Sequence, residues 1–296
     1  MGNAVNYAKV FEGQLAQKYS RELVTSGLTT QGVNFVGGNV VKLPFLTLAG
    51  YQNHNRDGGF ARGAVKNENM VKTLRHDRSV EFFVDAMDVD ETNQVLAATN
   101  LTNVFETEHA IPETDAYRFS QIFQQTSDLG GEVRNHPLIN SNILTVFDDM
   151  MQRMDEDEVP QEGRILYITP DVSKVLSQAS ELMRFVQVNG KGKGSKVNRN
   201  VRMLDEVEVV VVPSSRMKTA YNFQNGFVPA QNSRQINMML IHPSSVIAVN
   251  KHSYIKLWTP GSHTQGDGYL YQNRQYQDLF VIDTRLAGIS INLSNN

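Results

Sequence analysis

The chain has 296 residues, of which 40% are hydrophobic and 20% charged, so it is long enough for one or two ordered globular domains. Its net charge of −3 excludes a protein that neutralises nucleic-acid phosphates over its whole surface. The sequence contains no cysteine, which excludes disulfides, thiolate nucleophiles and cysteine-based zinc sites. No basic segment followed by an apolar run opens the sequence, so we expect no signal peptide.

Near the N-terminus, large apolar side chains recur at steps of four residues. This spacing predicts an amphipathic helix over residues 4–26, with Gly27 as its C-terminal stop. Two interpretations of the stripe remain open: it packs in the chain's own core, or it is an arm that lies on another subunit. Periodicity does not separate them. The stripe consists of Tyr7, Phe11, Leu15, Tyr19 and Leu23.

The next segment has the pattern of strands separated by a long polar excursion. Residues 33–36 and 40–48 are strand-like, and residues 78–87 alternate apolar and polar side chains as a strand does. Between them, residues 50–77 contain almost no large apolar side chains. Loops of this length inside a compact domain are uncommon and are usually functional or disordered. We therefore expect an extended hairpin loop that projects from a body.

Further along, two helical segments are followed by alternating strands and helices. Residues 89–127 read as helix that is interrupted or restarted at Pro112. Residues 141–156 form a second helix, whose stripe is Ile143, Val146, Phe147, Met150 and Met154. The mixture that follows predicts an α+β fold. It comprises a strand at 164–169, a helix from Pro170 to Leu182, and strands at 207–212, 236–241, 245–249 and near 254–258, 269–271, 279–282 and 286–292.

No stretch of the sequence carries a catalytic or metal-binding motif. The seven histidines include no pair spaced as in a zinc-binding helix. Residues 189–196 are rich in glycine and lysine, but they lack the Gly-Lys-Ser order and the following helix of a phosphate loop, so an exposed basic loop is expected. The acidic residues 155–158 are expected to end a helix in solvent, because the glycine of a calcium loop is missing. We therefore assign no catalytic, cofactor-binding or metal residues and expect no enzyme.

Charge is segregated in the middle of the chain. The excursion carries the basic residues Arg56, Arg62, Lys66, Lys72, Arg75 and Arg78. From Glu81 through Asp115 there are nine acidic residues and no lysine or arginine; Glu106, Glu108 and Glu113 are among them. Opposite charges favour contact between the basic loop of one copy and the acidic stretch of a neighbour. The equally weighted alternative is that both are solvated faces.

Three sequence segments, in the same order along the chain, resemble motifs of a known protein family. Residues 110–119 (AIPETDAYRF) resemble its spine-helix region. Residues 160–170 (PQEGRILYITP) resemble its segment P-x-x-G-R-x-L-Y-x-T-P, and residues 274–281 (RQYQDLFV) its segment R-x-Y-x-D-x-F-V. The order of elements agrees over nearly the whole chain. The sequence thus resembles the major capsid proteins of tailed bacteriophages, which have the Hong Kong 97-type fold.

The resemblance implies a part for each segment, and it leaves the place of the last strand open. An extended loop, the E-loop, would cover roughly residues 49–77 and lie across a neighbouring subunit. The implied segments are an N-terminal arm at 1–29, the E-loop hairpin with flanking strands at 30–88, the spine-helix region of a peripheral domain at 89–140, an axial domain at 141–238, and peripheral and C-terminal strands at 239–296.

The implied function is that of a structural subunit. It would assemble as pentamers and hexamers into an icosahedral head around double-stranded DNA, in the host bacterial cytoplasm, and reside in the virion. The implied partners are further copies of the chain, a portal, DNA held without sequence specificity, and no membrane. A separate scaffolding protein is also implied, because only about 30 residues precede the first strand.

Two other functions remain as alternatives. An encapsulin-like nanocompartment shell would need a groove for cargo, and a soluble hydrolase would need a nucleophile or a metal constellation. For the shell subunit, the inter-subunit contact candidates are Tyr7, Phe11, Leu15, Tyr19, Leu23, Arg56, Arg62, Lys66, Lys72, Arg75, Glu106, Glu108 and Glu113.

Overall fold

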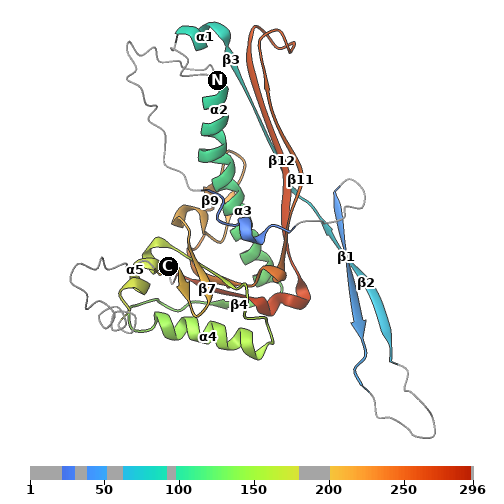
Figure 1. Ribbon diagram of the computed structural model, residues 1–296, viewed down its shortest axis with the longest axis vertical. Helices are drawn as coiled ribbons and strands as arrows, with labels where there is room; N and C mark the ends of the chain where they lie inside the picture. The colour runs from blue at the N-terminus through green and yellow to red at the C-terminus, as the bar shows by residue number, and fades with distance from the viewer. Residues whose placement is uncertain (1–21, 31–38, 52–62, 92–97, 180–200, 295–296) are drawn as a thin grey trace.

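The computed structural model describes residues 22–30, 39–51, 63–91, 98–179 and 201–294. Figure 1 shows a body built around two sheets, from which a two-stranded hairpin projects. Among the helices in these ranges, none combines the length and the apolar character needed to cross a membrane.

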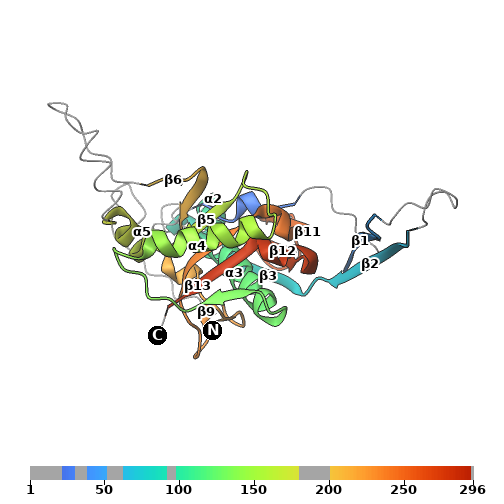
Figure 2. The ribbon, with the colours of Figure 1, turned by 90° about the horizontal axis from the view of Figure 1, so that it is seen from below.

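A six-stranded sheet lies between two helical layers. Its strand order is β4-β13-β10-β5-β7-β6, with β4 parallel to β13 and β5 parallel to β7. One face packs on α3 (Ile111–Asp128), and the other on α4 (Ile143–Glu156) and α5 (Pro170–Ser177). Figure 2 shows α4 running across this sheet. The strands are β4 (Glu132–Arg134), β5 (Ile165–Ile168), β6 (Met203–Leu204), β7 (Val207–Val211), β10 (Ile236–Ile241) and β13 (Ile289–Leu293).

A long three-stranded sheet extends away from the six-stranded one. Its central strand β12 (Gly268–Val281) pairs antiparallel with β11 (Val246–Trp258) and with β3 (His76–Asp85). A helical column runs along it, made of α2 (Ala98–Phe105), the π-helical turn η2 (Glu106–Ala110) and α3 (Figure 1). The short helix α1 (Ala86–Glu91) follows β3 directly. The helix expected over 89–127 is therefore confirmed in its described part, and the widened turn η2 stands just before Pro112, whose missing N–H cannot continue the α-helical ladder.

The projecting hairpin consists of β1 (Val40–Leu48) and β2 (Val65–Thr73). They pair antiparallel in unbroken register from Val40 opposite Thr73 to Leu48 opposite Val65. The remaining short elements are η1 (Ser26–Leu28), η3 (Ser214–Arg216), β8 (Tyr221–Asn222), β9 (Val228–Pro229), η4 (Pro243–Ser245) and η5 (Asp283–Gly288).

The helix α4 shows how the apolar pattern determines the core. All five residues of its predicted stripe are buried, and they pack against α5 and one face of the six-stranded sheet. Burying one such side chain is worth roughly 1.5–3 kcal/mol. Phe119 and Ile122 of α3 fill the opposite face, where Phe119 meets Tyr167 edge-to-face at 5.2 Å between ring centroids. The body therefore holds its own core on both sides of the sheet.

Several expectations need correction within the described residues. The separate strands expected at 245–249 and 254–258 are one strand, β11, and those at 269–271 and 279–282 are one strand, β12. The polar stretch 50–77 was expected to be loop, but residues 65–73 form β2, because pairing with β1 satisfies their backbone groups. The helix expected to reach Leu182 ends at Ser177. The helix expected over 4–26 lies outside the described residues up to 21, and beyond them it is wrong: residues 22–25 are irregular or turn, and Gly27 lies inside η1.

The sheets also divide the chain differently from the expected segments. A boundary between 238 and 239 falls inside β10. The last strand β13, whose place was left open, joins the six-stranded sheet together with β4 from the expected spine-helix segment. The segment 239–296 is therefore shared between both sheets. The chain returns to the first sheet because alternate residues of β13, such as Ile289 and Ile291, belong to its core.

Candidate inter-subunit surfaces

One face of the β1–β2 hairpin carries apolar side chains in solvent. Leu48 and Val65 stand opposite each other, and Val71 lies six residues along the same strand, so all three share one face. Their exposed fractions are 62%, 67% and 56%. An isolated two-stranded hairpin is marginally stable in water, and contiguous exposed apolar surface marks interaction sites. The described part of the hairpin thus presents exposed apolar side chains of the kind found at interaction sites.

The predicted cations of this segment have different surroundings. Arg56 and Arg62 lie outside the described residues. Lys66 and Arg75 are exposed. Lys72 already forms an ion pair within its own chain, because its ammonium lies 3.3 Å from the Asp283 carboxylate.

The predicted acidic partners are partly engaged within their own chain. Glu113 accepts a 2.6 Å hydrogen bond from Arg78, which stands on β3 directly opposite. Glu106 accepts hydrogen bonds from Asn273 and Tyr271. Glu108 is half-buried on η2 and also has an interaction within the chain. Among the described residues, the structure thus brings Arg78, the last cation of the predicted basic stretch, to Glu113 of the same chain.

The segment that follows the predicted arm is fixed to α3 by buried charges. The Asp115 carboxylate is fully buried and accepts from the Thr25 hydroxyl at 2.8 Å, the Thr25 N–H at 3.1 Å and the Arg216 guanidinium at 3.0 Å. Arg118 donates to the Thr25 carbonyl at 3.0 Å. Because Asp115 takes the N–H of Thr25, that N–H does not enter a helical ladder, which explains why no helix continues to residue 26. Of the predicted stripe, Tyr7, Phe11, Leu15 and Tyr19 lie outside the described residues and Leu23 is half-buried beside this anchor.

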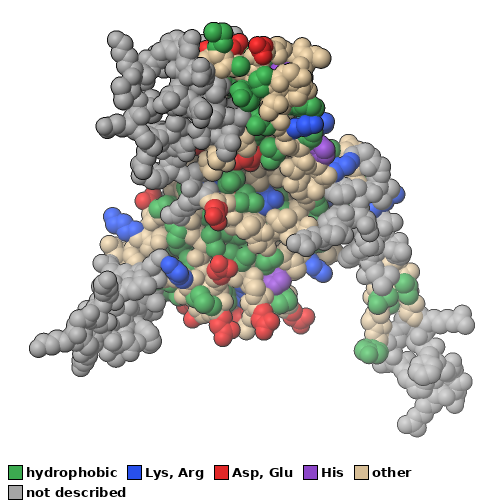
Figure 3. Space-filling model, turned by 45° about the horizontal axis from the view of Figure 1, so that its top comes forward, with side chains coloured by type: hydrophobic (Ala, Val, Ile, Leu, Met, Phe, Trp, Pro, Cys, Tyr) green, Lys and Arg blue, Asp and Glu red, His purple; other side chains and the backbone are tan. Residues whose placement is uncertain are grey.

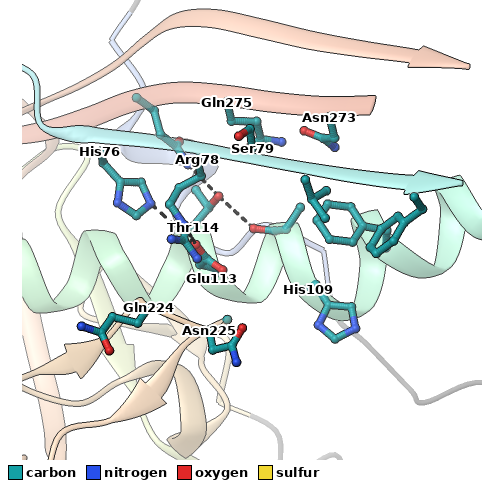
Figure 4. Close-up of a pocket in the computed structure, with 16 residues that line it drawn as sticks. His76, Arg78, Ser79, His109, Glu113, Thr114, Gln224, Asn225, Asn273 and Gln275 are labelled. Carbon is teal, nitrogen blue, oxygen red and sulfur yellow. Dashed lines mark hydrogen bonds and ion pairs between the residues drawn. The ribbon is translucent and has the colours of Figure 1, made fainter. Parts of the chain in front are cut away.

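A cavity of about 450 Å³ lies between β3, β12, the start of α3 and the loop between β8 and β9. In Figure 4, Arg78 and Glu113 point toward each other, with the amides of Gln224, Asn225 and Asn273 around them. His76 lies 3.9 Å from the Glu113 carboxylate. Burial, and next the charge of Arg78, lower the pKa of His76 to about 4, so it is neutral at pH 7 and forms no ion pair with Glu113 there. The pocket thus contains amides, rings and one satisfied ion pair.

Acidic side chains gather at one end of the body, at the lower edge in Figure 3. They stand on the solvent side of α4 and in the turn after it, where Arg164, itself buried, donates to Asp155 at 2.7 Å. The prediction that residues 155–158 lie in solvent is confirmed. In the part of the chain that the structure describes, no three histidine, aspartate or glutamate side chains converge as metal ligands would.

Sequence reasoning missed the buried polar groups that hold these surfaces in place. Asp115 belongs to the predicted acidic stretch, whereas Arg118 and Asp278 enter the sequence analysis only within the phrases that resemble the capsid family. A signal was present: each stands among apolar residues that the periodicity assigns to a core, and a charge is buried only with partners. The partners come from residues 90 or more positions away, so the pattern alone could not name them.

Comparisons with known proteins give a likeness of fold. No protein-family model matches the chain, and no curated protein matches it. The structure is similar to "Capsid structure of the Cyanophage P-SCSP1u" (TM-score 0.74, 14% identity, 98% of this chain and 93% of that one). It is similar to "Asymmetric unit of bacteriophage PhiM1 mature capsid" (0.71, 15%, 98% and 93%) and to a structure from Mycobacterium phage Che8 (0.64, 13%, 97% and 96%).

The agreement covers the hairpin, the helical column and both sheets together, since nearly the whole of each chain is aligned. It confirms the α+β capsid fold that the three sequence phrases implied. The chain has the fold of bacteriophage capsid proteins.

Proposed function

We propose that this chain is a major capsid protein, a structural subunit that assembles with copies of itself into the shell of a phage head. The observation that carries the proposal is the projecting β1–β2 hairpin, whose apolar face at Leu48, Val65 and Val71 has nothing of its own chain over it among the described residues. The capsid fold of the whole chain supports the same function.

The energetics fit a shell subunit. Covering one large apolar side chain is worth roughly 1.5–3 kcal/mol. A neighbour that covers the hairpin face in every copy repeats this gain around each closed ring of subunits. The hairpin then acts as the E-loop of the implied family. The segment near Thr25 is the root of the N-terminal arm, and the six-stranded sheet with α4 forms most of the axial domain.

The wider setting is part of the proposal. The subunits form pentamers and hexamers of an icosahedral head that encloses double-stranded DNA, and the shell is built in the bacterial cytoplasm. A separate scaffolding protein and a portal take part in assembly. DNA contacts are non-specific and local, because a net charge of −3 provides no basic surface over the whole protein.

Negative-stain microscopy of the purified chain, with and without Leu48→Asp and Val65→Asp together, tests the proposal. We expect closed shells or capsomers from the unchanged chain. The double variant should give folded subunits that do not close shells, because two charges then occupy the face that a neighbour covers.

A control on the body is Ile139→Asp, which places one such charge on an apolar side chain that is 54% exposed. It should assemble as the unchanged chain does. A small monodisperse monomer from the unchanged chain under all assembly conditions would contradict the shell function. Shells from the double variant would contradict the role of the hairpin face alone.

A further inference from the structure

The hairpin is connected to the body by a very short joint. Strand β2 ends at Thr73 and β3 begins at His76, so only Leu74 and Arg75 separate the projecting ribbon from the three-stranded sheet. Figure 1 shows the ribbon passing almost straight from one into the other. The direction in which the hairpin points is therefore decided by whatever holds these two residues.

A single buried carboxylate holds the joint. The ladder between β3 and β12 ends with His76 opposite Gln277. The next N–H along the chain, that of Arg75, donates to Oδ2 of Asp278 at 2.8 Å. Asp278 is only 4% exposed, so this hydrogen bond is shielded from water.

The second oxygen of the same carboxylate connects the joint to the spine helix. Oδ1 of Asp278 accepts from the Tyr117 hydroxyl at 2.7 Å and from the N–H of Leu279 at 2.8 Å. The Tyr117 ring stacks on His76, with centroids 3.7 Å apart and planes 19° from parallel. Asp278 thus joins three elements: the root of the hairpin (Leu74 and Arg75), β12 and α3.

Apolar contacts fix the other side of the joint. Leu74 is 3% exposed and shares a small cluster with Val41 at the start of β1 and with Val249 and Phe280 of the sheet. The Tyr276 hydroxyl donates to the Leu74 carbonyl at 3.1 Å. These contacts fix the position of Leu74. The hydrogen bond from Asp278 instead holds Arg75, the residue directly before β3.

Toward α3 the root borders open space. A cavity of about 570 Å³ lies between the end of β2 and the solvent side of α3, lined among others by Thr73, Gln121 and Gln124. Asp278 and Tyr117 form part of its wall. Because well-packed interiors resist movement, a hairpin that borders such a space can change direction once its hydrogen bonds are lost.

We propose that Asp278 is the positioning residue of the hairpin: its two oxygens, bound to Arg75 and Tyr117, set the angle between the β1–β2 hairpin and the body. A carboxylate suits this position because separate oxygens accept from separate elements, which the single oxygen of an asparagine cannot do. Burial raises the pKa of Asp278, and the surrounding donors favour its charged form. Any effect of this angle on shell assembly rests on the proposed function. The role of Asp278 in setting the angle does not depend on it.

The test measures the angle as a distance. Because the chain has no cysteine, Val65→Cys on the hairpin and Ile139→Cys on the body give two exposed sites for spin labels without other changes. Labelled chains are diluted into an excess of unlabelled chains, so that pulsed electron paramagnetic resonance reports distances within one subunit. We expect a narrow distance distribution for the chain with Asp278, and a broadened or shifted one for Asp278→Asn.

Two further variants separate positioning from general damage. Tyr117→Phe removes one of the hydrogen bonds and should broaden the distribution less than Asp278→Asn does. Asp283→Asn removes the exposed ion pair with Lys72 at the same root and should leave the distribution unchanged. Should Asp278→Asn fail to fold, Tyr117→Phe decides alone. A distribution identical to that of the unchanged chain in every folded variant of Asp278 and Tyr117 overturns the proposal.

Microscopy of Asp278→Asn and Tyr117→Phe without the two cysteines distinguishes this proposal from the proposed function, because Val65 lies on the face that assembly is proposed to need. An altered angle with normal shells would support the positioning role and contradict a need for a fixed hairpin in assembly. An unaltered angle in a chain that forms shells would contradict the positioning role alone.

Discussion

The six-stranded sheet and the β1–β2 hairpin differ in how much of their apolar surface is removed from water. In the body, residues such as Phe147 and Met150 of α4 are at most 1% exposed, because helices cover both faces of the sheet. In the hairpin, Leu48 and Val65 are more than half exposed. The body therefore completes its core alone, whereas the hairpin leaves apolar side chains exposed, on the face that we propose a neighbour covers. Changes in the two regions should accordingly differ in what they damage.

The largest expected effect is in the core of the body. Phe147→Ala removes a fully buried ring under the sheet and should lower the free energy of unfolding by about 3–5 kcal/mol. Denaturant titration followed by circular dichroism measures this. Leu48→Ala is the comparison and should change stability by less than about 0.5 kcal/mol. Equal losses would mean that the hairpin packs within its own chain.

A similar loss is expected at the anchor of the N-terminal segment. Asp115→Asn leaves the buried guanidiniums of Arg118 and Arg216 without a carboxylate, and breaking such a pair costs about 3–5 kcal/mol. Burial already lowers the pKa of Arg118, with Asp115 acting against this effect. Limited proteolysis should show earlier cleavage near residue 25 as well as lower stability. Lower stability without earlier cleavage there would contradict the anchoring role.

The joint of the hairpin should be sensitive to acid through His76. Its pKa is lowered from 6.5 to about 4 in the folded chain, so the unfolded chain binds more protons between these values. Stability should therefore fall as the pH drops from 6.5 to 4, by roughly 3 kcal/mol in total. The charged or titratable groups around it are Arg78 and Asp77 on β3, Glu113 and Tyr117 on α3, and Asp278 on β12.

The variant His76→Phe isolates this contribution, because it keeps the ring stack on Tyr117 without a titrating group. The raised pKa of Asp278 acts in the opposite direction, since its folded form takes up a proton at higher pH than the unfolded form does. Denaturant titrations at pH 7 and pH 4.5 therefore measure how much unfolding free energy the unchanged chain loses between these pH values. The same loss in His76→Phe is subtracted from it. An equal loss of stability in both would mean that His76 does not titrate in this range.

The smallest effect concerns charge on the hairpin. Lys66→Glu should slow shell assembly at low salt, measured by light scattering, because the hairpin then loses attraction for acidic neighbours. Exposed pairs are worth only about 0–1 kcal/mol. The difference should disappear near 1 M salt, where the Debye length is ~3 Å. Lys174→Glu on α5, where the lysine is also exposed, is the control on the body. The same slowing in both would indicate a net-charge effect.

The comparison also explains what the sequence could predict. The stripe of α4 and the strand at 40–48 follow from apolar periodicity, and the structure confirms both. Strand β2 could not be predicted, because Asn67, Glu68 and Asn69 have low strand propensity and are held by pairing with β1. The exposed face of the hairpin was not seen either, since a strand pattern does not say which face remains uncovered.

Charge patterns predicted less than apolar ones. The acidic stretch was recognised, but its member Glu113 meets Arg78 of the same chain. Opposite charges that are separated in sequence can meet within one chain or between chains, and here the packing of β3 against α3 brings Arg78 to Glu113. The contacts of Tyr7, Phe11, Leu15, Tyr19, Arg56 and Arg62 remain predictions, as does the choice of neighbour for Lys66 and Arg75.

The straight passage from β2 into β3 also has a mechanical consequence. A pull on the hairpin along its length is directed along β3, whose ten residues all pair with β12. The hydrogen bonds of an antiparallel ladder lie perpendicular to the strands, so such a pull loads them in shear, many at a time, and does not peel them one after another. The three-stranded sheet can therefore bear tension applied through the hairpin along its whole ladder with β3.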